Sequence, residues 1–138
     1  MATYVLDTSA IMCILLDEEG AQVVVGLLEA ARSSSSEERS TVLLPFVALM
    51  EVEYSLLRRL PTREVERHMF TVERWPAQVR ESNVPWRRQA ARVKAGGGLS
   101  LADAWIAALA IQEGGELVHK DPEFDQVDGL RSLRLPYR

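Results

Sequence analysis

The chain has 138 residues, of which 47% are hydrophobic and 26% are charged, and its formal net charge is -4. This length suits one domain with one core, and the composition excludes a disordered or fibrous protein. The single cysteine, Cys13, excludes an intrachain disulfide and a zinc site built from several thiolates. Because the longest apolar run near the N-terminus is also too short to span a bilayer, we expect a cytoplasmic protein with no membrane segment.

Short apolar strands alternate with helices along the chain. Strand composition predicts strands at residues 3–6, 41–45, 77–81, 116–120 and 130–135. Helical spacing of apolar residues, with proline or serine at several starts, predicts helices at residues 9–16, 21–32, 45–60, 62–75, 82–95 and 100–113. The serine-rich segment 33–39 is typical of a mobile surface loop.

This alternation predicts an α/β domain with a parallel sheet that is covered by helices on both faces. In such sheets ligands bind beyond the carboxyl ends of the strands. Asp7 and Asp121 each follow a predicted strand directly. We therefore expect both carboxylates at that edge of the sheet.

The charge of the chain is unevenly distributed. Residues 58–94 contain ten basic and four acidic side chains, a balance of +6, so the rest of the chain carries -10. One reading is a phosphate-binding face beside an acidic metal pocket, and the other is a set of solvated helices with ion pairs.

Two acids stand in apolar surroundings in the first half of the chain. Asp7 ends an apolar strand, where an ionised carboxylate is costly unless something compensates it, and the hydroxyls of Thr8 and Ser9 can fix its orientation. Glu51 and Glu53 share a largely apolar helix but lie about 200° apart around its axis, so at most one of them can point into a shared pocket. We favour Glu51, with Glu53 as the alternative.

Two further acids follow in the second half. Asp103 stands three residues after Ser100, so it can serve as part of a helix cap, and Asp121 precedes a proline, so it can simply start a turn. If the predicted elements converge, however, two such charges about 6 Å apart repel each other by roughly 3 kcal/mol. Oxygen ligands of this kind suit Mg²⁺ or Mn²⁺, and Mg²⁺ favours phosphate-ester chemistry.

The four acids occur in four stretches, YVLDTSAI at 4–11, LPFVALMEVEYSLLRR at 44–59, LSLADAWIAALA at 99–110 and LVHKDPEFD at 117–125. In order, spacing and apolar surroundings these stretches resemble the acidic motifs of PIN-domain nucleases, in particular the VapC-type toxins of type II toxin–antitoxin systems. The resemblance covers residues 3–135.

The resemblance implies a single PIN-like domain over residues 1–138, built as a three-layer α/β/α sandwich around a mostly parallel sheet of four to five strands. It also implies an endoribonuclease that depends on Mg²⁺ or Mn²⁺, in which the metal activates the attacking water. The same resemblance makes Ser9 the supporting hydroxyl, and it implies a homodimer held inactive by a small antitoxin. The catalytic and metal-binding residues would be Asp7, Glu51, Asp103 and Asp121.

The chain departs from the family pattern at His119, where a Thr or Ser commonly stands two residues before the last acid. The histidine either donates a hydrogen bond in place of that hydroxyl or fills the end of the strand. From the basic stretch we expect RNA to bind along the helices that contain Arg58, Arg63, Arg87 and Arg88.

Two other functions fit parts of the sequence. One is a catalytically silent PIN-like domain that binds metal, RNA or a protein without cutting, which the altered position 119 keeps open. The other is a phosphotransfer domain with Asp7 as nucleophile, although Ser9 stands where the familiar phosphatase motif has its second carboxylate.

Overall fold

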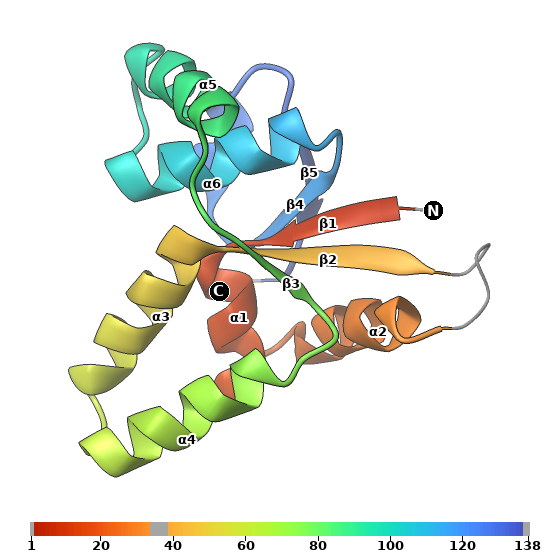
Figure 1. The fold of residues 1–138 in the computed structure, drawn as a ribbon, viewed down its shortest axis with the longest axis vertical. Coiled ribbons are helices and arrows are strands. Elements are labelled where there is room, and N and C mark those ends of the chain that lie inside the picture. Colours follow the sequence, from red (N-terminus) through yellow and green to blue (C-terminus); the bar gives the residue numbers. More distant parts are fainter. Residues whose placement is uncertain (1, 34–38, 137–138) are drawn as a thin grey trace.

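A computed structural model describes residues 2–33 and 39–136 of the chain. In these residues five strands form one sheet in the order β3-β2-β1-β4-β5, and every pair of neighbours is parallel (Figure 1). The strands are β1 (Ala2–Leu6), β2 (Ser40–Pro45), β3 (Gln78–Arg80), β4 (Glu116–His119) and β5 (Arg131–Arg134). This sheet confirms the predicted α/β class.

Helices cover both faces of the sheet. α6 packs on one face and is backed by α5, while α1 and α2 pack on the other face (Figure 1). α3 leaves the end of β2 and forms an arm with α4. The helices are α1 (Thr8–Leu15), α2 (Ala21–Ala31), α3 (Phe46–Leu57), α4 (Thr62–Glu73), α5 (Val84–Ala95) and α6 (Leu101–Gln112), and a 3₁₀ helix, η1 (Pro122–Gln126), follows β4.

The core explains why these segments form a sheet. The ends of the three central strands are almost fully buried, because helices cover them on both sides. In α6 a run of small residues, including Ala107, Ala108 and Ala110, allows the helix to pack closely on the sheet. The free energy gained by burying this apolar surface, roughly 25 cal/mol per Å², holds the strand ends at one edge.

Three aromatic rings fix the start of α3 against α5 and α6. Phe46, Trp86 and Trp105 meet edge to face, with ring centroids 5.0 to 5.6 Å apart. The indole Nε1–H of Trp86 also donates a 2.7 Å hydrogen bond to the backbone oxygen of Trp105. Since α3 and α6 each carry one of the predicted site acids, this cluster fixes the distance between them.

The predicted elements agree with the structure except at a few ends and at η1, which the sequence analysis did not predict. Pro45 is the last residue of β2 rather than the first residue of a helix, because its backbone stays extended, and it stands at the position just before α3. Most of the loop predicted at 33–39 lies outside the described residues. Among the described residues, no helix combines the length and hydropathy that crossing a bilayer would need.

Candidate metal centre

Asp7 lies at the carboxyl end of β1, between the strand and α1. Its backbone is extended, and its Oδ1 accepts a 2.9 Å hydrogen bond from the backbone N–H of Ala10, so it caps α1. The Ser9 hydroxyl donates a second bond of 2.6 Å to the same oxygen. Ser9 Oγ also accepts from the N–H of Lys120, which ties the start of α1 to the end of β4.

Glu51 lies in the second turn of α3 and is half-buried, whereas Glu53 is exposed on the same helix. The Thr8 hydroxyl donates a 2.6 Å hydrogen bond to Glu51 Oε1. We expected Thr8 to hold Asp7, but α3 packs against α1 and brings Glu51 within reach of that hydroxyl instead. The two neighbouring hydroxyls thus orient two different carboxylates.

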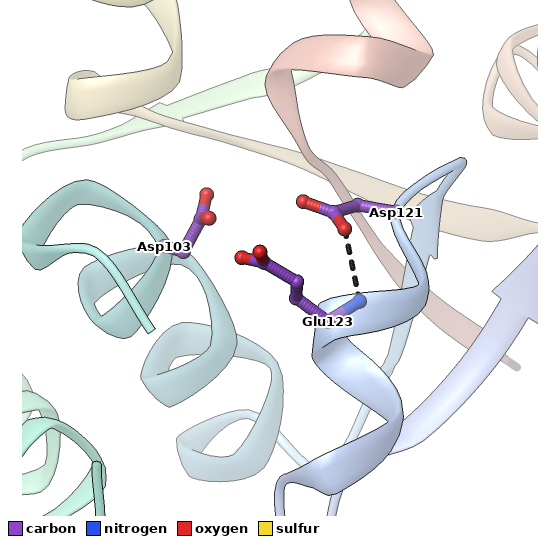
Figure 2. Close-up of side chains that lie close together, drawn as sticks. All are labelled: Asp103, Asp121 and Glu123. Atoms are coloured by element: carbon purple, nitrogen blue, oxygen red, sulfur yellow. Dashed lines mark hydrogen bonds between the residues drawn. The ribbon is translucent and has the colours of Figure 1, made fainter. Parts of the chain in front are cut away.

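Asp103 lies in the first turn of α6, after the cap that Ser100 provides. The Ser100 hydroxyl accepts a 3.1 Å hydrogen bond from the Asp103 backbone N–H, so the capping pattern read from the sequence is present. The Asp103 side chain also lies close to two acids that follow β4 (Figure 2). The cap and the cluster are therefore compatible, since Asp103 is capped through its backbone N–H and still lies in the cluster.

Asp121 and Glu123 complete the cluster from the start of η1. Asp121 Oδ1 accepts a 2.9 Å hydrogen bond from the Glu123 backbone N–H, drawn as the dashed line in Figure 2. One oxygen from each of Asp103, Asp121 and Glu123 lies within 4.8 Å of the others. Glu123 was not among the predicted site residues. The signal for it is the Asp-Pro pair at the start of η1, since the turn that Asp121 caps places the next acid beside Asp121.

Asp7 and Asp103 have raised pKa values and, among the described residues, no basic side chain that pairs with them. Burial raises the pKa of Asp7 to about 7, and the carboxylates of Asp103 and Asp121 contribute to this rise. Burial likewise raises the pKa of Asp103 to about 6, with Glu51 as the next cause. Among the described residues, no Lys or Arg forms a salt bridge with these acids, and nearby Lys120 pairs with Glu18 at 3.3 Å.

The oxygen-only donor set fits a hard divalent cation such as Mg²⁺ or Mn²⁺. A cation of this kind would offset both the repulsion and the cost of burial that the raised pKa values report. The described residues Asp7, Glu51, Asp103, Asp121 and Glu123 supply the carboxylates that could hold or surround it.

His119 is buried beside the cluster and does not enter it. Its Nδ1 accepts a 3.0 Å hydrogen bond from the Asp121 backbone N–H, and its Nε2 lies 3.0 Å from Ser132 Oγ. Burial lowers the pKa of the ring, which keeps it neutral at neutral pH. Of the two roles left open for His119, the ring fills the end of the strand, and it accepts a hydrogen bond from the Asp121 backbone rather than donating one to its side chain.

The predicted RNA-binding arginines are all exposed, but they lie on two separate parts of the molecule. Arg58 caps the end of α3 and Arg63 opens α4, in the turn at the lower left of Figure 1. Arg87 and Arg88 lie on α5, at the top of the same view. Arg87 lines a mostly apolar groove between α5 and α6 that reaches Leu101 and Ala104, on either side of Asp103.

Comparison with known proteins places these features in context. The family model for the PIN domain matches residues 4–130. A search of curated protein sequences finds no significant match.

Solved structures share the fold at low sequence identity. The structure resembles DNA-bound VapBC2 from Rickettsia felis, with TM-score 0.79, 14% identity, and 97% of this chain and 99% of that chain covered. For DNA-bound VapBC from Salmonella typhimurium the TM-score is 0.72 at 22% identity, with 97% of this chain and 98% of that chain covered. For the sarcin–ricin loop cleaving toxin VapC20 from Mycobacterium tuberculosis the TM-score is 0.66 at 16% identity, with 93% of this chain and 98% of that chain covered.

Proposed function

Since this chain belongs to the PIN domain family, we propose that it is a metal-dependent endoribonuclease of the VapC toxin type that hydrolyses RNA phosphodiester bonds. The observation that carries the proposal is the convergence of acids from β1, α3, α6 and η1 at one sheet edge without a pairing cation among the described residues. Separate elements bring these charges together at a cost, which is typical of a site that needs them.

We assign the metal-binding role to Asp7, Asp103 and Asp121, which would be ionised around Mg²⁺ or Mn²⁺, with Glu51 beside them. Asp7 is held by Ser9 and Ala10, so its free oxygen has a fixed direction. When bound, such a cation supplies Lewis-acid stabilisation of the charge that develops on the phosphate. Glu123 shares the cluster, and we propose it as an additional acidic member.

Glu51 has a different environment from the other acids. One of its oxygens accepts from Thr8, which fixes the side chain at the edge of the site. From that position a carboxylate can accept a proton from an attacking water, either directly or through one further water. We therefore propose Glu51 as a catalytic residue as well as a contributor to the negative field.

RNA would approach between the two groups of arginines. Phosphates bound by Arg87 and Arg88 on α5 and by Arg58 and Arg63 near the α3–α4 turn would lie on either side of the acids. Cations that flank rather than fill the acidic site attract the substrate without neutralising the ligands of the metal.

We further propose that a small antitoxin inhibits the chain in the cytoplasm and that the chain forms a homodimer. Several of the structurally similar proteins were solved as toxin–antitoxin complexes. Met50, Tyr54 and Leu57 form an exposed apolar stripe at helical spacing on α3, and a partner chain would cover such a stripe. Co-purification with the product of a neighbouring gene, and light scattering of the isolated chain, test the two statements.

The decisive experiment is cleavage of a panel of structured RNAs with Mn²⁺, with Mg²⁺ and with EDTA. We expect cleavage only with a divalent cation, and its loss in Asp7→Asn, while Asp17→Asn on the exposed turn after α1 retains full activity. Cleavage that persists in EDTA would contradict the proposal. Binding of Mn²⁺ and RNA without cleavage of any substrate would instead assign a catalytically silent PIN domain.

A further inference from the structure

We propose that His119 is a positioning residue for Asp121, because its Nδ1 holds the backbone N–H of Asp121 and thereby sets where that carboxylate stands. The inference rests on the proposed function, in which Asp121 is a metal ligand. It assigns a role to the position at which this chain departs from the family pattern.

The hydrogen bond is local, and the ring that accepts it is buried. His119 is the last residue of β4 and only 1% exposed, and the N–H of Asp121 lies 3.0 Å from its Nδ1. Asp121 follows the strand, so its N–H has left the regular ladder and needs another partner. The imidazole supplies that partner where the family pattern has a hydroxyl.

The neighbouring strand fixes the protonation pattern of the ring. Because Nδ1 accepts a hydrogen bond, the proton of the neutral imidazole lies on Nε2. Ser132 on β5 offers its hydroxyl oxygen to that Nε2–H at 3.0 Å. β5 thus keeps Nδ1 free as an acceptor, and this links the edge of the sheet to the acidic cluster.

The ring also supports the element that carries Glu123. His119 packs on Phe124 of η1, with ring centroids 4.9 Å apart. In the same 3₁₀ helix, the Glu123 backbone N–H donates its hydrogen bond to Asp121 Oδ1. A shift of the imidazole would therefore move two of the three carboxylates that lie within 4.8 Å of one another.

Two amide substitutions distinguish the roles of the two ring nitrogens of His119. In His119→Asn the side-chain oxygen takes the place of Nδ1, so the bond from the Asp121 N–H can form whereas the bond to Ser132 cannot. In His119→Gln the amide reaches the place of Nε2, so the bond to Ser132 can form but Asp121 has no acceptor for its N–H. Both variants remove the same ring, so each is the control for the other.

Two measurements decide the proposal. Outer-shell partners of metal ligands typically contribute about 10- to 100-fold to metal affinity, so we expect His119→Gln to bind Mn²⁺ that much more weakly and His119→Asn to stay within about threefold of wild type. Amide hydrogen exchange at Asp121, measured by NMR without metal, should be slow in wild type and His119→Asn and fast in His119→Gln.

Equal Mn²⁺ affinity and equal exchange in the two variants would overturn the proposal. If wild type fails to bind Mn²⁺, the proposed metal site fails, and the exchange rates still decide whether His119 positions Asp121. Should both variants unfold, Ser132→Ala on the exposed edge strand replaces them. Loss of one hydrogen bond there predicts roughly fivefold faster exchange at Asp121, and unchanged exchange would count against the proposal.

Discussion

Replacement of Asp7 by asparagine tests whether this carboxylate destabilises the fold when no cation is bound. Asp7 is 4% exposed, and burial raises its pKa from 3.8 to about 7. Because the folded state then binds the proton more tightly than the unfolded state, wild-type stability should fall as pH rises between these two values. At about 1.4 kcal/mol per pKa unit, the ionised carboxylate costs up to about 4 kcal/mol above pH 7.

Asparagine removes this cost and keeps the cap, since its oxygen can still accept from Ser9 and Ala10. In EDTA at pH 8 we therefore expect Asp7→Asn to be more stable than wild type by about 2 to 4 kcal/mol, with the difference shrinking toward pH 5. Urea unfolding followed by tryptophan fluorescence measures the free energy of unfolding of each protein at each pH. Asp17→Asn, an exposed aspartate after the same helix, should change stability by less than about 0.5 kcal/mol.

Addition of Mn²⁺ should remove most of the stability advantage of Asp7→Asn over wild type. A cation that binds only the folded state adds about 3 kcal/mol at one hundred times its dissociation constant, and wild type should gain this while Asp7→Asn gains far less. Equal stability of variant and wild type in EDTA at pH 8 would refute the argument from burial. Equal gains in Mn²⁺ would refute the assignment of Asp7 as a ligand.

Three further predictions concern the other acids, the arginines and the histidine. Glu51→Gln should lower the rate of RNA cleavage by about 100-fold or more, as loss of a general base does, whereas exposed Glu53→Gln should leave it unchanged. Reversal of charge at Arg87 and Arg88 should weaken RNA binding and flatten its dependence on log salt by about 0.7 for each phosphate that is no longer bound, and an unchanged slope would make α5 an ordinary solvated face. Because burial lowers the pKa of His119, the contribution of this residue to stability should fall as pH drops below 6.5, opposite to the trend from Asp7, so wild type should lose stability relative to His119→Asn over that range in urea titrations.

The fold could be predicted from local signals. Apolar strands that alternate with capped helices specify a parallel sheet covered on both faces, and the structure shows that sheet. The 3₁₀ helix η1 was missed because an Asp-Pro pair fits a simple turn equally well. Glu123 was missed with it, since its place beside Asp121 follows from that helix.

The partners of the site residues depend on packing that the sequence does not reveal. Thr8 and Glu51 are 43 residues apart, and the bond between them depends on the way α3 crosses α1. His119 and Ser132 meet only because β5 pairs with β4 in one register. Spacing along the chain identified the acids, but the groups that orient them come from neighbouring elements.

The bond between Ser9 and Lys120 has a consequence for biosynthesis, because 111 residues separate its two ends. At typical translation speeds, roughly 6 to 22 s pass between the emergence of these two residues from the ribosome. During this interval β1 lacks its neighbour β4, and the first aspartate stands without the later carboxylates. A nascent chain therefore cannot complete the acidic cluster until its last quarter is being made.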